Sequence, residues 1–302
     1  MICLSWPPNR SRPGVLASRT LALVLAGCAL SAGLSSCGAD DERGGAAELV
    51  DGGATVVVAN SPGTLSTNGP QRVMVALLGA AANQFLGGED KPALIEFRAA
   101  DGTTDEVPGQ WLSSGVGLGL YVARYTFPAD GVWEIRVKGN SDTPAPATVN
   151  VGRDSAVPEI GDPAPPSQTP TSDTTPDLTE ISTDPEPDPR FYSLSVADAV
   201  NSGRPSVIVF ATPAFCQTAL CGPTLDIAKK VAATRPDVEF VHVEPYDLDQ
   251  ARAGELVPID TMLDWNLATE PWVFVVDSNG KVAASFEGVI GQAELAAAID
   301  AL

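Results

Sequence analysis

The sequence predicts an all-β region followed by an α/β region, joined by a segment that cannot build a core of its own. Short apolar segments separated by turn residues recur over residues 54–151, as expected of a β-sandwich. From residue 191 the predicted elements follow the order strand-helix-strand and then strand-strand-helix, which gives a mixed sheet with helices on both faces. Residues 152–190, in between, contain nine prolines and nine acidic residues. At 302 residues the chain can bury two modest cores.

The first 37 residues have the pattern of a bacterial lipoprotein signal peptide. Three arginines precede an apolar run over residues 21–34, and this segment contains no acidic residue. Two stretches resemble a lipobox, one ending at Cys28 and the other at Cys37. We favour Cys37, because cleavage at Cys28 leaves an apolar stub on the mature protein, whereas residues 38–53 form a flexible polar tether. The alternative is an ordinary signal without a lipid. A lipid on Cys37 predicts an anchored protein on the extracytoplasmic face of the cell membrane.

Charge and cysteine usage restrict the partners. The chain carries a net charge of −20, and loss of the signal removes three arginines and no acid. Such a balance disfavours binding to nucleic acid and docking onto anionic lipid headgroups, so we expect the lipid chain, not charge, to hold the protein at the membrane. Cys3 and Cys28 leave with the signal and Cys37 takes the lipid. Cys216 and Cys221 therefore remain as the only possible intrachain pair, which suits an oxidising compartment.

The all-β prediction for residues 54–151 comes from alternating apolar and polar side chains. The clearest signal is a hairpin over residues 120–137, which resembles the immunoglobulin-like modules of secreted bacterial proteins and so predicts an Ig-like β-sandwich. Trp111, Tyr121, Tyr125 and Trp133 could form a binding platform, although packing in the core is the commoner fate of such aromatics. The predicted strands cover residues 55–59, 72–78, 93–98, 119–127, 131–138 and 148–151.

The acidic, proline-rich residues 152–190 are predicted to be a linker. A segment with so few apolar side chains cannot bury a core, and its like charges repel, so we expect an extended spacer that gives reach from the membrane. A docking motif for a partner is the alternative.

The α/β prediction covers residues 191–302. Ser195 is placed to cap a short helix that ends at Gly203, and Ser278-Asn279-Gly280 is a hairpin turn. The predicted strands are 205–211, 238–244, 272–277 and 281–286, and the predicted helices are 217–234, one or two within 248–265, and 291–302.

Two cysteines follow the first strand of this region. An apolar run over residues 207–211 leads to Cys216 at the mouth of a predicted helix, with Cys221 five positions later. Backbone N–H groups and the helix dipole favour a thiolate there, so Cys216 is expected to be the more reactive thiol. In regular helix the Cα atoms of residues five apart lie about 8.6 Å apart, beyond the limit of about 7 Å for a disulfide. Either Cys216 lies in the loop before a reshaped first turn, or the helix unwinds locally at Gly222-Pro223.

These features resemble the thioredoxin superfamily. Cys216 and Cys221 stand where that family carries its cysteine pair, and residues 269–282 match its cis-proline strand and hairpin. The resemblance implies a cis Pro271 that faces the cysteines and a Glu270-Pro271 backbone that holds the substrate strand. It also implies a thiol-disulfide oxidoreductase that acts on protein thiols or disulfides, with Cys216 attacking and Cys221 resolving, and with no cofactor and no metal.

Departures from the family pattern leave two alternatives open. The four-residue spacer between the cysteines resembles one subgroup of peroxiredoxins, whose first cysteine attacks peroxide, but Thr212 stands one place too early for that family and Pro213 occupies its threonine position. A surface binding or adaptor lipoprotein with a structural disulfide is the other alternative. His242, the only histidine, is expected on a half-buried strand, with proton transfer to the cysteines as the alternative. A histidine on a strand fits poorly with a copper site made of the two cysteines and a nearby loop histidine. Cys216, Cys221 and His242 also cannot supply the four ligands of a zinc site.

Overall fold

The structure is a computed structural model that describes residues 53–302 apart from 82–83, 115–116, 118 and 140–143. The predicted signal peptide, both candidate lipidation sites at Cys28 and Cys37, and nearly all of the 38–53 tether lie outside the described residues. Within the described part, no helix has the length and apolar character needed to cross a bilayer.

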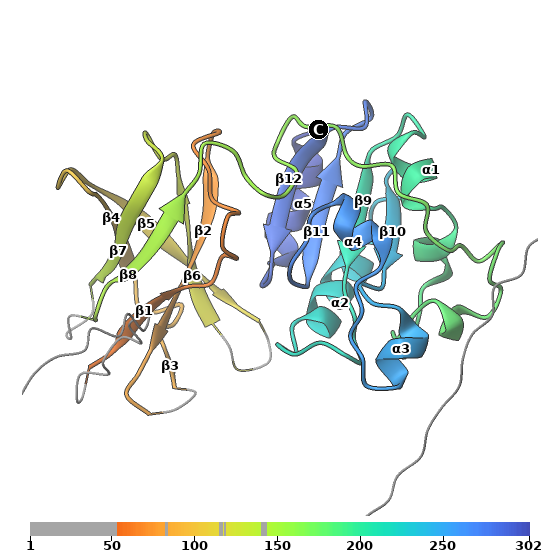
Figure 1. Cartoon of the computed structure of the whole chain (residues 1–302), viewed down its shortest axis with the longest axis horizontal. Helices are drawn as coiled ribbons and strands as arrows, with labels where there is room; N and C mark the ends of the chain where they lie inside the picture. Colours follow the sequence, from red (N-terminus) through yellow and green to blue (C-terminus); the bar gives the residue numbers. More distant parts are fainter. Residues whose placement is uncertain (1–52, 82–83, 115–116, 118, 140–143) are drawn as a thin grey trace, which may run out of the picture. The chain divides into compact units, whose positions relative to one another are not determined.

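The N-terminal region is a single antiparallel sheet with the strand order β1-β2-β6-β5-β4-β7-β8, to which β3 adds at β2 (Figure 1). The sheet curls until its ends meet, because Val56 N–H donates to the carbonyl of Ala145 at 2.9 Å, just before β8. The strands are β1 (Thr55–Val58), β2 (Gln71–Leu78), β3 (Phe85–Leu86), β4 (Ala93–Ala99), β5 (Thr104–Ser113), β6 (Gly119–Tyr125), β7 (Gly131–Lys138) and β8 (Ala147–Val151). The six predicted strands are present, and β3 and β5 are additional.

Strand β5 makes this sheet differ from the predicted Ig-like sandwich of two separate sheets. Its first half, up to Gly109, pairs with β4, and its second half, from Gln110, pairs with β6. Strand β5 therefore joins into one sheet the two groups of strands that a sandwich keeps as separate sheets. The core that the curled sheet encloses contains Tyr121, Tyr125 and Trp133. Core packing rather than a binding platform is thus the role of these three aromatic side chains.

The predicted hairpin over residues 120–137 is wrong in its pairing, although both strands form. Strand β6 pairs with β2 and β5, whereas β7 pairs with β4 and β8. Phe127, 1% exposed, turns into the core between the strands and packs edge-on against Trp133 at 5.3 Å between ring centroids. Burial of this ring stabilises a connection that crosses from β6 to β7 on a different part of the sheet, in place of a tight hairpin turn.

The C-terminal region has a four-stranded mixed sheet in the order β10-β9-β11-β12. Strands β9 and β10 are parallel, and β11 runs antiparallel to both β9 and β12. The strands are β9 (Ser206–Phe210), β10 (Glu239–Val243), β11 (Trp272–Val276) and β12 (Val282–Glu287). They match the predicted positions, and the β11–β12 hairpin turns at Gly280, whose φ of +73° suits glycine.

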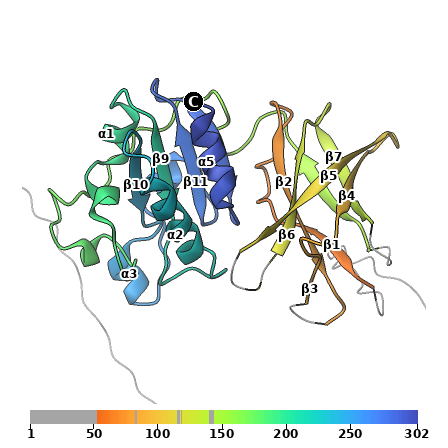
Figure 2. The same ribbon diagram turned by 180° about the vertical axis from the view of Figure 1, so that it is seen from behind.

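Helices cover both faces of this sheet, as predicted. Alternate residues of β9 point to opposite faces, with Val207 and Val209 toward α2 and α5, and Ile208 and Phe210 toward α1 and α4. Helices α2 and α5 lie in front of the sheet in Figure 2, and α4 lies in front in Figure 1. The helices are α1 (Val196–Val200), α2 (Cys221–Ala232), α3 (Leu248–Arg252), α4 (Asp260–Asp264) and α5 (Gln292–Asp300).

The predicted extended spacer over residues 152–190 is instead packed on the C-terminal region. Val282 at the edge of β12 exchanges backbone hydrogen bonds with it, accepting from Gly161 at 2.8 Å and donating to Asp162 at 2.9 Å. Residues 166–192, here called the strap, continue past α1 and β10 and contain two short 3-10 helices, Leu178–Glu180 and Pro189–Tyr192. Aspartates cap both of these helices, so acidic residues that composition assigns to a solvated chain instead satisfy backbone N–H groups.

Truncation of Phe274 tests the packing of this core. Phe274 is fully buried in an aromatic cluster, and its ring centroid lies 4.7 Å from that of Trp265 and 5.5 Å from that of Trp272. We expect Phe274→Ala to lower the free energy of unfolding by about 3–5 kcal/mol, because a cavity is left among rigid rings. Leu263→Ala, at a side chain 66% exposed on α4, should change it by less than about 0.5 kcal/mol. Urea unfolding followed by tryptophan fluorescence measures both, and equal losses in the two variants contradict the assignment.

Candidate functional site

The two cysteines lie on the connection between β9 and α2. The chain leaves β9 through a turn in which Phe215 N–H donates to the carbonyl of Thr212, and Ala219 then adopts a left-handed φ of +58°. That residue cannot continue a helix, so α2 begins at Cys221, four residues after the predicted start. Cys216 therefore lies in the loop before a reshaped first turn, which is the first of the two arrangements that the spacing allowed.

Cys216 sits where the N-terminus of α2 stabilises a negative charge. Its Sγ accepts the backbone N–H of Cys221 at 3.3 Å and lies 3.4 Å from Thr218 Oγ1. The hydrogen bond from the Cys221 thiol, followed by those from Thr218 and the backbone N–H groups, lowers the pKa of Cys216 to about 5 against the opposing effect of burial. At neutral pH a half-buried thiolate is thus presented at the surface.

Cys221 is the complementary member of the pair. Its side chain is fully buried, and both thiols are free. Donation of a hydrogen bond to Cys216 and then burial raise the pKa of Cys221, so it keeps its proton at neutral pH. One thiolate nucleophile and one protonated thiol within reach is the arrangement that thiol-disulfide exchange uses.

Glu270 and Pro271 lie beside these sulfurs, at the start of β11. The Glu270–Pro271 peptide bond is cis, as predicted. A carboxylate oxygen of Glu270 and both Sγ atoms all lie within 4.8 Å of one another. Burial raises the pKa of Glu270, while Tyr246, whose hydroxyl donates to Glu270 Oε2 at 2.7 Å, acts in the opposite direction. Sequence reasoning did not identify Tyr246, since a tyrosine after β10 carries no local signal of its partner.

These three side chains are also the group of described residues that could hold a metal ion. They offer two sulfurs and one oxygen, from Cys216, Cys221 and Glu270. Structural zinc sites use four protein ligands, so this set is one short of that coordination.

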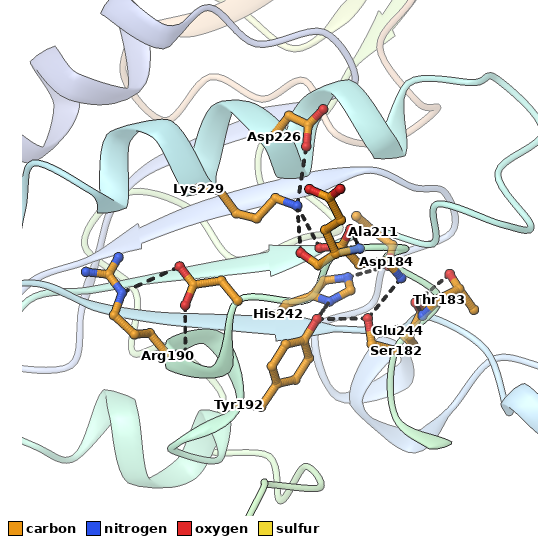
Figure 3. A network of polar contacts seen from close by, with 12 residues as sticks. Ser182, Thr183, Asp184, Arg190, Tyr192, Ala211, Asp226, Lys229, His242 and Glu244 are labelled. Carbon is orange, nitrogen blue, oxygen red and sulfur yellow. Dashed lines mark hydrogen bonds and ion pairs between the residues drawn. The ribbon is translucent and has the colours of Figure 1, made fainter. Parts of the chain in front are cut away.

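His242 does not serve the cysteines. It lies on β10, fully enclosed, with Nε2 2.8 Å from the carbonyl oxygen of Ala211 and Nδ1 2.8 Å from the hydroxyl of Tyr192 (Figure 3). Burial lowers its pKa, so the ring favours the neutral form. Its two nitrogens tie the end of β9 to the strap, which is a structural role.

The strap also holds the loop that leads to Cys216. Thr183 donates from both its N–H and its hydroxyl to Glu244 Oε1, at 2.6 and 2.7 Å, and its hydroxyl oxygen accepts the N–H of Ala214 at 3.1 Å. Next to it, Asp184 accepts a hydrogen bond from Lys229 of α2 at 2.8 Å (Figure 3). These contacts connect the strap to both sides of the cysteine pair. No local pattern of residues predicts these contacts, because turn-forming side chains do not reveal which distant backbone groups they bond.

Removal of the Thr183 hydroxyl tests this connection. Valine has nearly the shape of threonine, but Thr183→Val leaves Ala214 N–H without its partner. We expect a loss of about 1–2 kcal/mol in the free energy of unfolding and slower alkylation of Cys216, since the loop is less firmly placed. Thr179→Val on the same segment, where the side chain bonds only to exposed Asp177, should change neither quantity measurably. Unchanged alkylation in Thr183→Val contradicts a positioning role.

Comparison with known proteins gave matches to solved structures alone. No family model matches the sequence, and no curated protein matches it. One similar structure is MTB dsbF in its mixed oxidised and reduced forms, with 24% identity and a TM-score of 0.28 over 35% of this chain and 84% of that one. Another is a thiol:disulfide interchange protein of the thioredoxin family from Chlorobium tepidum TLS, with 16% identity and a TM-score of 0.30 over 47% of this chain and 97% of that one. The strand order, the cysteine loop after β9 and the cis-proline before β11 give residues 191–302 a thioredoxin-like fold.

Proposed function

We propose that this protein is a membrane-anchored thiol-disulfide oxidoreductase of the extracytoplasmic face, which exchanges disulfides with protein substrates through Cys216 and Cys221. The observation that carries the proposal is the placement of Cys216 Sγ 3.3 Å from the first N–H group of α2, with the protonated Cys221 thiol beside it. A half-buried thiolate next to a buried thiol is the minimum that exchange chemistry requires.

The reaction proceeds in two displacements. The Cys216 thiolate attacks one sulfur of a substrate disulfide, forms a mixed disulfide, and expels the other sulfur as a thiolate that takes a proton from water. Cys221 then gives up its proton and attacks Cys216 Sγ, which releases the second substrate sulfur as a thiolate that is protonated in turn. The substrate disulfide is reduced to two thiols, and the Cys216–Cys221 pair is oxidised to a disulfide. The reverse sequence oxidises a substrate.

The cis Glu270–Pro271 segment supports the substrate role in this proposal. It lies beside both sulfurs and opens β11, so an extended substrate segment bonded to Cys216 would lie next to it. The negative charge of Glu270, added to that of the Cys216 thiolate, further raises the pKa of Cys221, beyond the effects of its hydrogen bond to Cys216 and of burial. Glu270 therefore opposes ionisation of Cys221.

Reduction of insulin disulfides tests the activity. We expect the purified full chain to reduce insulin in the presence of dithiothreitol, and we expect Cys216→Ala to fall to the rate of dithiothreitol alone. An equal rate for the two proteins overturns the proposal and leaves a binding lipoprotein as the alternative. Anchoring is tested separately, because Cys37→Ala should move the protein from the membrane fraction to the soluble fraction, whereas Cys28→Ala should not.

A further inference from the structure

Three side chains with metal-binding atoms meet at the cysteine site, and they come from three separate segments. Cys216 lies in the loop after β9, Cys221 opens α2, and Glu270 stands shortly before β11. Both Sγ atoms and one carboxylate oxygen lie within 4.8 Å of one another. In a tetrahedral zinc site, with Zn–S of about 2.3 Å and Zn–O of about 2.1 Å, two sulfurs lie about 3.8 Å apart and a sulfur and an oxygen about 3.5 Å apart. Shifts of about 1 Å therefore bring all three atoms around one ion.

The two sulfurs are in a state that can accept a cation. Both thiols are free, and Cys216 is a thiolate at neutral pH. The Cys221 thiol donates a hydrogen bond to Cys216, so its proton lies between the two sulfurs, in the place that a metal ion takes over. Binding releases this proton to solvent, because the thiolate is the form that ligates metals. Although Cys221 is fully buried, its sulfur is reached from the side of the half-buried Cys216.

The charges that act on these donors are negative. The thiolate of Cys216 and the carboxylate of Glu270 both raise the pKa of Cys221, and the thiolate also raises the pKa of Glu270. Among the described residues, no lysine, arginine or histidine forms an ion pair with Glu270. A divalent cation between these groups converts their mutual repulsion into attraction.

Tyr246 holds the carboxylate from outside this group of donors. Its hydroxyl donates to Glu270 Oε2 at 2.7 Å, which fixes the orientation of the carboxylate without occupying a position on the ion. Metal-ligating carboxylates in proteins are themselves held by hydrogen bonds of this kind. Because Cys216 is half-buried, water can supply the ligand that the three side chains lack. Three protein ligands and one water make a four-coordinate zinc site with an open position.

We propose that Cys216, Cys221 and Glu270 of the reduced protein bind a divalent cation of the zinc class, with water as the fourth ligand. Thiolates select zinc over magnesium and calcium, and the carboxylate favours it over monovalent copper. A disulfide between the cysteines removes both sulfur ligands, so the ion binds the reduced form alone. The bound ion in turn withholds the Cys216 thiolate from other disulfides. Binding goes beyond the proposed exchange activity and does not depend on it.

Titration of the reduced, metal-free full chain with Zn²⁺ in competition with a chromophoric chelator tests the site. We expect one equivalent to bind the reduced protein and none to bind the oxidised protein with this affinity. Cys221→Ser should abolish binding, because it removes one thiolate ligand. Glu270→Gln, which removes the charge but keeps the shape, and Tyr246→Phe, which removes the hydroxyl alone, should each weaken the affinity by about 10–100-fold.

The matched control is Asp237→Asn, which removes an exposed acid before β10, at the end of the sheet opposite to the cysteine loop. It should leave the affinity for Zn²⁺ unchanged. A second measurement is alkylation of Cys216 by iodoacetamide, which one equivalent of Zn²⁺ should slow by about tenfold or more and which excess EDTA should restore.

The outcomes for this site and for the exchange activity are separate. Equal Zn²⁺ affinity of the oxidised and reduced proteins, or an affinity that Glu270→Gln leaves unchanged or that Asp237→Asn lowers as much, overturns the inference. If the protein reduces insulin but fails these tests, the oxidoreductase proposal stands without the metal site. If it binds Zn²⁺ as expected but does not reduce insulin, the metal site stands and the oxidoreductase proposal fails.

Discussion

Replacement of Cys216 by serine should lower disulfide reduction by about 10³-fold or more, because an alcohol at this position is neither ionised nor strongly nucleophilic at neutral pH. The loss should be larger than that for any other single side chain of the site. Cys216 Sγ is the atom that the N-terminus of α2 stabilises, and Cys221 is fully buried behind it.

Cys221→Ser is the informative companion variant. It keeps the attacking thiolate but removes the thiol that releases the substrate, so a mixed disulfide should accumulate and should be visible as a mass increase under non-reducing conditions. Thr218 Oγ1 still bonds to Cys216 in this variant. Full turnover in Cys216→Ser, or a mixed disulfide that forms on Cys221 in that variant, contradicts the assigned roles.

The alkylation rate of Cys216 should depend on pH with a midpoint near 5, the value to which its hydrogen bonds lower its pKa. Iodoacetamide reacts with the thiolate, so the rate should rise through that midpoint and then stay level across neutral pH. An ordinary cysteine, with a pKa of about 8.5, gains about tenfold in rate per pH unit over the same interval. Cys221 should remain unreactive in the folded protein, because its pKa is raised and its side chain is buried.

The same depressed pKa makes the free energy of unfolding of the reduced protein increase as pH rises. The unfolded chain holds the Cys216 proton up to about pH 8.5, whereas the folded chain releases it near pH 5, so the unfolded state binds more protons between these values. This contribution is fully present above the unfolded pKa and is lost as pH falls through about 5. Cys216→Ala should remove it. A rate profile for Cys216 that rises steadily from pH 6 to 9 contradicts both expectations.

The order of elements in the C-terminal region could be predicted because each one carries its own local signal. Strands β9 and β11 are almost continuous apolar runs. Ser195 caps α1 by accepting the N–H of Asp198, and Gly280 marks the hairpin turn. The start of α2 was misplaced, since nothing in the sequence signals the left-handed conformation of Ala219. That conformation depends on how the loop packs.

The failures share one physical cause, which is that pairing across the chain is not a local property. Half of the residues of β5 are polar, and the strand contains Pro108 and Gly109, so its sequence lacks the alternation typical of a strand. Pairing with its two neighbours, β4 and β6, makes it one. Residues 152–190 have the composition of a solvated linker, and contacts with distant parts of the chain order them: residues 161 and 162 bond to the edge of β12, and the strap bonds to Glu244, Ala214 and His242. Thr183 and Tyr246 can be recognised as site residues only from their contacts in the folded structure, because their partners are distant in the sequence.

The reduction potential of the Cys216–Cys221 couple tests the central claim that these two thiols exchange with outside disulfides. The full chain can be equilibrated in glutathione buffers, and its thiols then trapped and counted by mass. The low pKa of Cys216 stabilises the reduced form, so the potential should lie between about −270 and −120 mV, as in exchange-active proteins. A value below about −300 mV, where the disulfide resists reduction by glutathione, contradicts the claim and marks the bond as structural.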